Sequence, residues 1–349
     1  LAHFTLLHPE LVVTDPAALS EEQKKAIVAQ CLALSIEGET YEYTPSNFKR
    51  KNIMKPTILV AGGTGNLGGR IIKALIKRGA EVRALVRNGS EPEKIEKLTE
   101  LGAKVVTVDL SNAEDLKQAC QGISCVVSAL SGLHDVIVDS QIKLLDAAIA
   151  AGVPRFIPSD YSSDFTKLPA GENRNFDLRK EFHQYLDKSS IAATSILNGA
   201  FADILAYGTP LYNVKNYSVG YWGDKSDWKI DFTTMDDTAD YTAAAAIDPS
   251  TPKILRIASF QISPNELVAI GAEVKQQEFK LVPMGSMEDF SASNKQERAE
   301  NPAGEKELFP SWQGKQYLHS MFSVQNTPLD NDRYPDVQWT SAMDVISKI

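Results

Sequence analysis

A glycine-rich segment at residues 61–70 (AGGTGNLGGR) directly follows a short run of apolar residues. Its glycines fit the spacing Gly62-x-x-Gly65-x-x-Gly68 and, in a shifted register, Gly63-x-Gly65-x-x-Gly68. Glycine at these positions lets the backbone turn tightly and approach a pyrophosphate, while the amides that open the following helix point at the anion. We expect Gly65 to need a positive φ and Gly68 to let the helix lie against the strand. The spacing therefore predicts a dinucleotide-phosphate site rather than a surface turn.

A second group with a chemical role stands at the end of the next apolar run, residues 81–87 (EVRALVR). Proteins that prefer NAD place an aspartate or glutamate near this point, about 20 residues after the glycines, to bind the ribose hydroxyls. Here the position holds Arg87, whose guanidinium can pair in a bidentate manner with a 2′-phosphate. Lys94 follows and adds positive charge. These residues favour NADP(H) as the cofactor, and the alternative for Arg87 is a solvated loop cation.

The chain around these motifs alternates between short β-branched runs and longer amphipathic stretches that end at glycine. Such βαβ alternation predicts a parallel sheet that is covered on both faces. Because crossover connections are right-handed, the expected architecture is α/β, a doubly wound parallel-sheet Rossmann fold. The expected strands are residues 57–61, 81–87, 104–109, 125–130 and 155–158, and the expected helices are 68–78, 91–101, 113–120 and 135–151.

Three regions differ in character along the chain. Residues 1–53 hold a predicted amphipathic helix over 20–36 and a polar linker, which we interpret as an N-terminal appendage. Residues 54–200 are the predicted NADP-binding Rossmann domain. Beyond them the alternation loosens, so residues 201–349 are predicted as a smaller C-terminal substrate-binding lobe, parts of which return to the Rossmann sheet. Within this lobe, Asp236 and Asp237 are predicted to cap a helix over 238–247.

Composition narrows the class of protein. The net charge of -9 argues against a general nucleic-acid surface, although it permits a local positive site for an anionic cofactor. No apolar stretch approaches the ~20 residues that a membrane span needs. The cysteines Cys31, Cys120 and Cys125 form no close pair, so we predict neither a disulfide framework nor a metal site. We expect a cytoplasmic protein, monomeric or homodimeric, that acts on a small-molecule substrate.

Several segments together resemble one known family. They are GGTGNLG at residues 62–68, LVR at 85–87, the run from 102 to 130 that ends in CVVSAL, PRFIPSDY at 154–161, NGAFADIL at 198–205 and MDDTADYTAAAAIDP at 235–249. In order and spacing they are similar to isoflavone reductases, phenylcoumaran benzylic ether reductases and NmrA-like proteins, an atypical branch of the short-chain dehydrogenase/reductases. The resemblance covers roughly residues 56–290. It implies an extended Rossmann domain, NADPH at the glycine-rich loop, and a substrate cleft roofed by the C-terminal lobe.

Carried over position by position, the resemblance assigns residues to the cofactor. Residues 158–161 correspond to a segment that borders the nicotinamide, although Ser159 and Asp160 are equally suited to cap a helix. Arg87 matches the arginine that selects NADP. The phosphate loop is matched by Gly62, Thr64, Gly65, Asn66, Leu67 and Gly68, the adenine border by Asp109 and Leu110, and the end of the fourth strand by Ser128 and Ala129.

The catalytic residue is open between two neighbours. Reductases of this family use a lysine in a Phe-Asp-x-Lys stretch, and this chain reads FDLRK at residues 176–180. Without a gap the lysine position holds Arg179, which can orient an anion but cannot shuttle a proton because it stays protonated. Lys180 takes the role if the helix phase shifts by one residue, and otherwise it is a solvated cation. His183, one turn from Arg179, is predicted to be a surface histidine, and the alternative is that it lines a cleft.

These expectations lead to two candidate functions. The first is an NADPH-dependent reductase that transfers a hydride to a small aromatic, quinone or carbonyl substrate, with Lys180 or a water supplying the proton. The second is a non-catalytic NADP(H)-binding redox sensor or regulator of the NmrA type. The substantial C-terminal lobe favours the reductase, and the displaced lysine favours the sensor.

Overall fold

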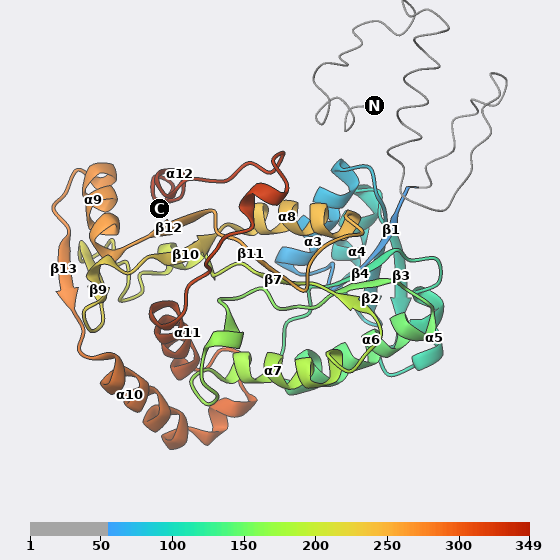
Figure 1. Ribbon diagram of the computed structural model, residues 1–349, viewed down its shortest axis with the longest axis horizontal. Helices are drawn as coiled ribbons and strands as arrows, with labels where there is room; N and C mark the ends of the chain where they lie inside the picture. Colours follow the sequence, from blue (N-terminus) through green and yellow to red (C-terminus); the bar gives the residue numbers. More distant parts are fainter. Residues whose placement is uncertain (1–54) are drawn as a thin grey trace, which may run out of the picture. The chain divides into compact units, whose positions relative to one another are not determined.

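A six-stranded parallel sheet forms the centre of the part of the chain that the computed structural model describes, residues 55–349. The strands lie in the order β3-β2-β1-β4-β5-β6 (Figure 1). This is the strand order of a doubly wound Rossmann sheet, and it confirms the predicted fold class. The predicted appendage, its helix and Cys31 lie outside the described residues. The strands are β1 (Thr57–Ala61), β2 (Glu81–Arg87), β3 (Lys104–Val108), β4 (Cys125–Ser128), β5 (Arg155–Ile157) and β6 (Ala192–Ala193).

The strand order reverses between β1 and β4. Open α/β sheets bind ligands in the crevice outside the carboxyl ends of the strands at such a switch point. Ala61 ends β1 and pairs with Ser128, which ends β4. The aliphatic runs TILVA and CVVS are buried almost throughout, because helices pack on both sides of these central strands. The crevice therefore opens beside Ala61 and Ser128.

Two helical layers enclose the sheet (Figure 1). On α3, the buried side chains Ile71, Ile72 and Leu75 recur at helical spacing and face the strands. The layer with α3 (Asn66–Lys77) also contains α4 (Pro92–Glu100) and α8 (Met235–Ile247). The opposite layer contains α5 (Ala113–Ala119), α6 (Gln141–Ala150), which continues the π-helical turn η4 (Asp135–Ser140), and α7 (Arg174–Leu186).

A separate apolar core lies beyond the carboxyl edge of the sheet. It is built around the three-stranded sheet β12-β10-β8 and the pair β13-β9, while β7 pairs with β11 beside the Rossmann sheet. Strands of this region are β7 (Ser195–Leu197), β8 (Ala200–Phe201), β9 (Ser218–Tyr221), β10 (Ile230–Thr233), β11 (Ile254–Arg256), β12 (Phe260–Ile262) and β13 (Lys280–Pro283). Its α-helices are α9 (Pro264–Lys275), α10 (Met287–Glu300), α11 (Ser311–Ser323) and α12 (Ala342–Ile346). The short 3-10 turns of residues 55–349 are η5 (Phe165–Lys167), η6 (Ala202–Tyr207), η7 (Lys225–Asp227), η8 (Pro302–Lys306) and η9 (Asn331–Arg333).

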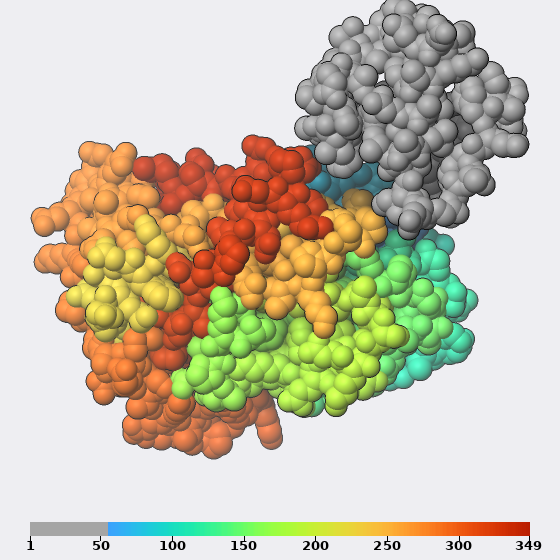
Figure 2. Space-filling model, viewed as in Figure 1, coloured from blue at the N-terminus to red at the C-terminus, as the bar shows by residue number. Residues whose placement is uncertain are grey.

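A C-terminal segment, residues 326–340, crosses the outer face of α8 and is called the strap here; Figure 2 shows it in red on the surface. The Tyr241 hydroxyl of α8 donates to the carbonyl of Asp330 at 2.7 Å. Arg78, which caps α3, pairs with Asp336 at 2.6 Å. The amide of Thr340 donates to Asp237 at 2.8 Å. The strap and α8 thus pack with the Rossmann layer although they follow residue 200, and a domain boundary at that residue stays a prediction.

Local differences from the expected elements have local causes. The first helix begins at Asn66 rather than at residue 68, because Gly65 already takes the N-cap conformation. The prediction that Asp236 and Asp237 cap the helix predicted over residues 238–247 was wrong. That helix is α8, and Thr234 caps it by accepting a hydrogen bond from the amide of Asp237. The Asp237 carboxylate instead binds Ser259 and the strap residue Thr340.

Candidate functional site

The glycine-rich loop wraps the carboxyl end of β1 against the loop after β4. Gly62 has φ +84°, and a Cβ there would lie 2.5 Å from the carbonyl oxygen of Ala129. A Cβ on Gly68 would lie 2.2 Å from the carbonyl oxygen of Gly62, so only glycine lets α3 approach the strand this closely. Gly65 has φ -83°, and the expected positive φ at this residue was therefore wrong. The left-handed position of the loop is Gly62.

The N-terminus of α3 is open to an anion. No side chain caps this helix, and its N-cap, Gly65, is exposed. The first amides of a helix have no partner within the helix, so those of Asn66, Leu67 and Gly68 are left for a ligand. The Asn66 side chain is turned to Arg70, whose Nε donates to it at 2.9 Å. Thr64 lies in the same loop, and no α-helix forms before Asn66 in the part of the chain described.

Arg87 stands exposed at the carboxyl end of β2, next to the crevice. Its guanidinium has no ion-pair partner within residues 55–349, whereas the Lys94 ammonium is held by Glu91 at 2.8 Å. Asp109, just beyond β3, accepts from the Ser111 hydroxyl and amide at 2.7 and 2.8 Å. These two bonds from Ser111 lower the pKa of Asp109. Leu110, the next predicted residue, packs partly against the apolar core below.

The ends of β4 and β5 complete the crevice. Ser128 is fully buried, and its hydroxyl has no hydrogen-bond partner among the described residues. The carbonyl of Ala129 packs against Gly62, where it leaves no room for a Cβ. Ser159 donates its hydroxyl to the carbonyl of Leu130 at 2.7 Å, and its amide donates to Gln141 at 2.9 Å. Ser159 therefore joins the two loops and does not cap a helix.

The two candidate catalytic side chains on α7 point to different surroundings. The Lys180 ammonium donates to the carbonyl of Leu168 at 2.6 Å and lies 3.5 Å from Asp177. The Arg179 guanidinium donates to the carbonyl of Asn175 at 2.9 Å, and its Nε is buried without a described partner. Lys180 is thus held at the Leu168 carbonyl, whereas Arg179 keeps an unused donor.

One buried polar cluster, made of Asp160, His183 and Ser195, was not predicted from the sequence. The prediction that His183 is a surface histidine was wrong: its side chain is 20% exposed and Nε2 lies 2.7 Å from Oδ2 of Asp160. Ser195 donates to the same carboxylate oxygen at 2.7 Å. Neither Asp160 nor Ser159 caps α7, whose N-cap is Asn173. No local signal links these three residues, since they come from the loop after β5, from α7 and from β7.

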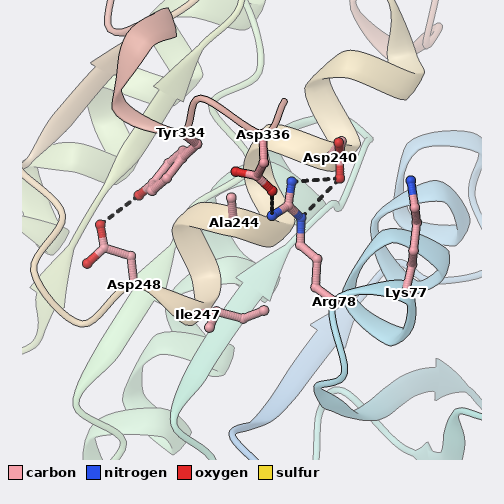
Figure 3. A pocket seen from close by; sticks show the side chains of 8 residues that line it. All are labelled: Lys77, Arg78, Asp240, Ala244, Ile247, Asp248, Tyr334 and Asp336. Atoms are coloured by element: carbon pink, nitrogen blue, oxygen red, sulfur yellow. Dashed lines mark hydrogen bonds and ion pairs between the residues drawn. The ribbon is translucent and has the colours of Figure 1, made fainter. Parts of the chain in front are cut away.

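A cavity of about 550 Å³ lies at the other end of α3, beside its last residue, Lys77, and its C-cap, Arg78 (Figure 3). Most of its charged side chains pair with one another: Arg78 pairs with Asp240 at 3.0 Å and with Asp336, and Tyr334 donates to Asp248 at 2.8 Å. A helix of 12 residues spans ~18 Å, so this cavity is remote from the glycine-rich loop. It is therefore not the dinucleotide crevice.

Residues 55–349 contain neither a candidate membrane span nor a candidate metal cluster. No helix in this part of the chain is both long and apolar enough to pass through a bilayer. No group of three or more His, Cys, Asp or Glu side chains gathers there as a metal site.

The glycine cradle, the uncapped helix and the orphaned Ser128 hydroxyl fit a dinucleotide laid across the carboxyl edge of the sheet. The fold and this site define a Rossmann-fold dinucleotide-binding protein. The chain belongs to the NmrA-like family, whose model matches residues 54–303. The predicted family membership is thereby confirmed.

Known relatives share this architecture. Pinoresinol reductase 2 of Arabidopsis thaliana is 32% identical over 270 residues, which are 72% of this chain and 84% of the relative. A bifunctional pinoresinol-lariciresinol reductase of Linum perenne is 27% identical over 318 residues. The match covers 84% of this chain and 99% of the relative. The solved structure of AtPrR2 with NADP+ and (+)pinoresinol has a TM-score of 0.68 at 28% identity, covering 84% of this chain and 98% of that one. A leucoanthocyanidin reductase–NADPH complex from Vitis vinifera, at 20% identity and TM-score 0.69, matches in fold.

Proposed function

We propose that the protein is an NADPH-dependent reductase that transfers a hydride to a small organic substrate. The observation that carries the proposal is the N-terminus of α3, which no side chain caps and which follows the close contact between Gly62 and Gly68. Arg87, at the carboxyl end of β2, is exposed and has no ion-pair partner among the described residues. The names of the relatives, pinoresinol reductases, and the NADP+ in the structure of one neighbour support it.

The chain's own residues have separable tasks in this proposal. The amides of Asn66, Leu67 and Gly68 bind the pyrophosphate, and Arg87 binds the 2′-phosphate. Ser128 and Ser159 border the nicotinamide, which supplies the hydride when the cofactor is bound. Lys180, or a water, delivers the proton, and Arg179 orients an anionic or polar group of the substrate.

The substrate class we propose is an aromatic, quinone or carbonyl compound. The pinoresinol bound in the neighbouring structure supports an aromatic member of this class. Steady oxidation of NADPH with a panel that includes pinoresinol, quinones and aromatic carbonyls tests the proposal. We expect the parent protein to reduce at least one compound of the panel, and the double variant Arg87→Ala, Gly65→Val to reduce none. Binding of NADPH by the parent without turnover of any compound contradicts the proposal.

A second candidate function is a non-catalytic NADP(H) sensor. Two observations favour it: Arg179 occupies the ungapped lysine position, and the Lys180 ammonium is bound to the Leu168 carbonyl. Such a protein binds NADPH and NADP+ with different affinities and oxidises nothing. The same panel, combined with titrations of both cofactor forms, separates the two functions.

The setting of the protein is also a proposal. We propose that it works in the cytoplasm as a monomer or homodimer. Cys120 and Cys125 are free thiols, and burial raises their pKa values to about 11 and about 12, which suits a chain that needs no disulfide. Light scattering of the purified protein, with and without NADPH, determines the oligomeric state.

A further inference from the structure

Asp160 is a buried carboxylate at the carboxyl end of β5. Its side chain is 0% exposed, and Oδ2 accepts hydrogen bonds from His183 Nε2 and from the Ser195 hydroxyl, each at 2.7 Å. The other oxygen, Oδ1, is buried and has no partner among the described residues. Burying a carboxylate is costly unless a cation and hydrogen bonds compensate for the lost water. His183 is the cation within hydrogen-bond distance of it.

His183 reaches solvent on its other side. Its ring lies between Phe165 and Phe182, with centroids 5.4 and 6.0 Å away. It also lines a cavity of about 310 Å³ between α7, η5, β7 and β11, whose lining includes the charged residues Asp187 and Lys253. Protons of the solvent therefore have access to the imidazole, although its partner Asp160 is sealed off.

The charged groups around His183 act in opposite directions. Burial lowers the pKa of His183, but Asp160, through its charge and its hydrogen bond, and then Asp187 raise it, while Arg179 lowers it slightly. The net result is a pKa above the ordinary histidine value, so that the imidazolium persists to a higher pH than in a free histidine.

A continuous series of contacts leads from this pair to the crevice. Asp160 directly follows Ser159, whose hydroxyl and amide hold Leu130 and Gln141. The amide of Leu130 lies 3.2 Å from the place that a Cβ on Gly62 would take, so this loop packs on the glycine-rich loop itself. A shift of the turn at residues 158–160 is thus transmitted to the wall of the crevice.

We propose that His183, as an imidazolium, is a positioning residue for the cofactor: by pairing with Asp160 it holds the turn at residues 158–160 and, through Ser159, the Leu130 loop against Gly62. The inference rests on the proposed function, in which NADPH occupies this crevice. Because the folded protein favours the protonated imidazole, the stabilisation is complete below the ordinary pKa of ~6.5 and is lost as the pH rises through the raised value. The affinity for NADPH therefore falls in the alkaline direction.

The test is the dissociation constant of the binary NADPH complex between about pH 6 and 9, measured by fluorescence for three proteins. In the parent, affinity falls by about tenfold, a size typical of coupled sites. His183→Arg keeps a permanent cation, and the adjoining cavity has room for it, so its affinity stays high at every pH. His183→Gln removes the charge and binds weakly throughout. The 2′-phosphate of NADPH itself titrates near pH 6 and changes the affinity of all three proteins alike. The quantity compared is therefore the dissociation constant of each variant divided by that of the parent at the same pH.

Two matched controls separate this role from a general effect of substitution. Ser195→Ala removes one hydrogen bond to Asp160 but leaves the ion pair, so the pH profile keeps its midpoint. His134→Gln removes a histidine whose pKa is also raised, by Glu181, but whose side chain is 51% exposed. Its profile follows the parent.

Parallel profiles for the parent and His183→Arg overturn the inference while leaving the proposed function intact. Failure of the parent to bind NADPH at any pH overturns the proposed function.

In that case hydrogen exchange of the free protein decides the inference. The exchange rate at the amides of residues 159–161, corrected for the intrinsic effect of pH, is expected to rise above the pH at which His183 loses its proton. This rise is expected in the parent and not in His183→Arg. Equal exchange in the two proteins contradicts the inference.

Discussion

The two ends of the crevice are built in different ways. At the phosphate end, residues 61–70, the site consists of backbone. Gly62 supplies a left-handed turn, Gly68 lets α3 approach the Gly62 carbonyl closely, and the first amides of α3 are free to bind an anion. At the β5 end, residues 158–161 with α7, it consists of side chains: Asp160 is held by His183 and Ser195. One end is contiguous in the sequence, and the other is assembled from three distant segments.

This contrast teaches what each end tolerates. A backbone site depends on the absence of side chains, so any Cβ at a crowded glycine damages it, whatever the chemistry of the new residue. A site built from paired charges depends on protonation states and on their compensation, so it responds to pH and to conservative exchanges. The phosphate end should therefore give steric, pH-independent phenotypes, and the β5 end electrostatic ones.

The largest expected effect tests the chemistry at the β5 end. Lys180→Ala should lower turnover by ~10²–10⁴-fold, the usual contribution of a positioned acid, with NADPH affinity nearly unchanged. Arg179→Ala is the control and should raise KM more than it lowers kcat. A greater loss of kcat in Arg179→Ala would show that the ungapped position is the functional one, in keeping with the bond between Lys180 and the Leu168 carbonyl.

The next effect tests whether the phosphate end is a backbone site. Gly65→Val should weaken NADPH binding at least ~100-fold, or about 2.8 kcal/mol, because the side chain fills the approach of the pyrophosphate. Its φ of -83° suits valine and a Cβ meets only the Gly62 carbonyl at 3.2 Å, so the variant should fold normally. Gly68→Val, with a Cβ 2.2 Å from that carbonyl, should instead lower Tm as well. Equal melting temperatures for the two variants would contradict this assignment.

A smaller effect concerns cofactor choice. Arg87→Ala should reduce the preference for NADPH over NADH by about tenfold, or ~1.4 kcal/mol, because the guanidinium no longer meets the 2′-phosphate. Fluorescence titrations with both cofactors measure the ratio. An unchanged ratio would make Arg87 a solvated cation and leave selectivity to another group.

The smallest effect belongs to Lys94. Its ammonium is paired with Glu91 on the surface, and exposed pairs of this kind contribute little. Lys94→Ala should therefore change the NADPH dissociation constant by only about twofold. A tenfold loss in the same titration would show that Lys94 leaves Glu91 to bind the cofactor.

The sequence predicted what short-range rules determine. The doubly wound parallel sheet follows from βαβ alternation, and β1 and β2 begin and end where their apolar runs do, because burial on both faces requires such runs. The phosphate loop was predictable since its glycines sit at a strand-to-helix junction. The positive φ was assigned to the wrong glycine: the left-handed residue is Gly62, where Ala129, far along the chain, also leaves no room for a Cβ.

Long-range pairing could not be predicted in the same way. Nothing in the residues next to His183 indicates that α7 turns it toward Asp160, because that depends on how the helix is rotated against β5 and β7. The cap of α8 was missed for a related reason. Asp237 has the right chemistry for a cap, but Ser259 and Thr340 engage it, and Thr234 takes the role.

The strap has a consequence for the order of assembly during synthesis. Domains emerge from the ribosome N-terminal end first and generally fold as units. In this chain the outer surface of α8 and the end of α3 acquire their partners Asp330, Asp336 and Thr340 only from the strap. A nascent chain halted before residue 326 exposes Tyr241 and leaves Arg78 with Asp240 alone, so the nucleotide-binding half is completed only after the strap has been synthesised.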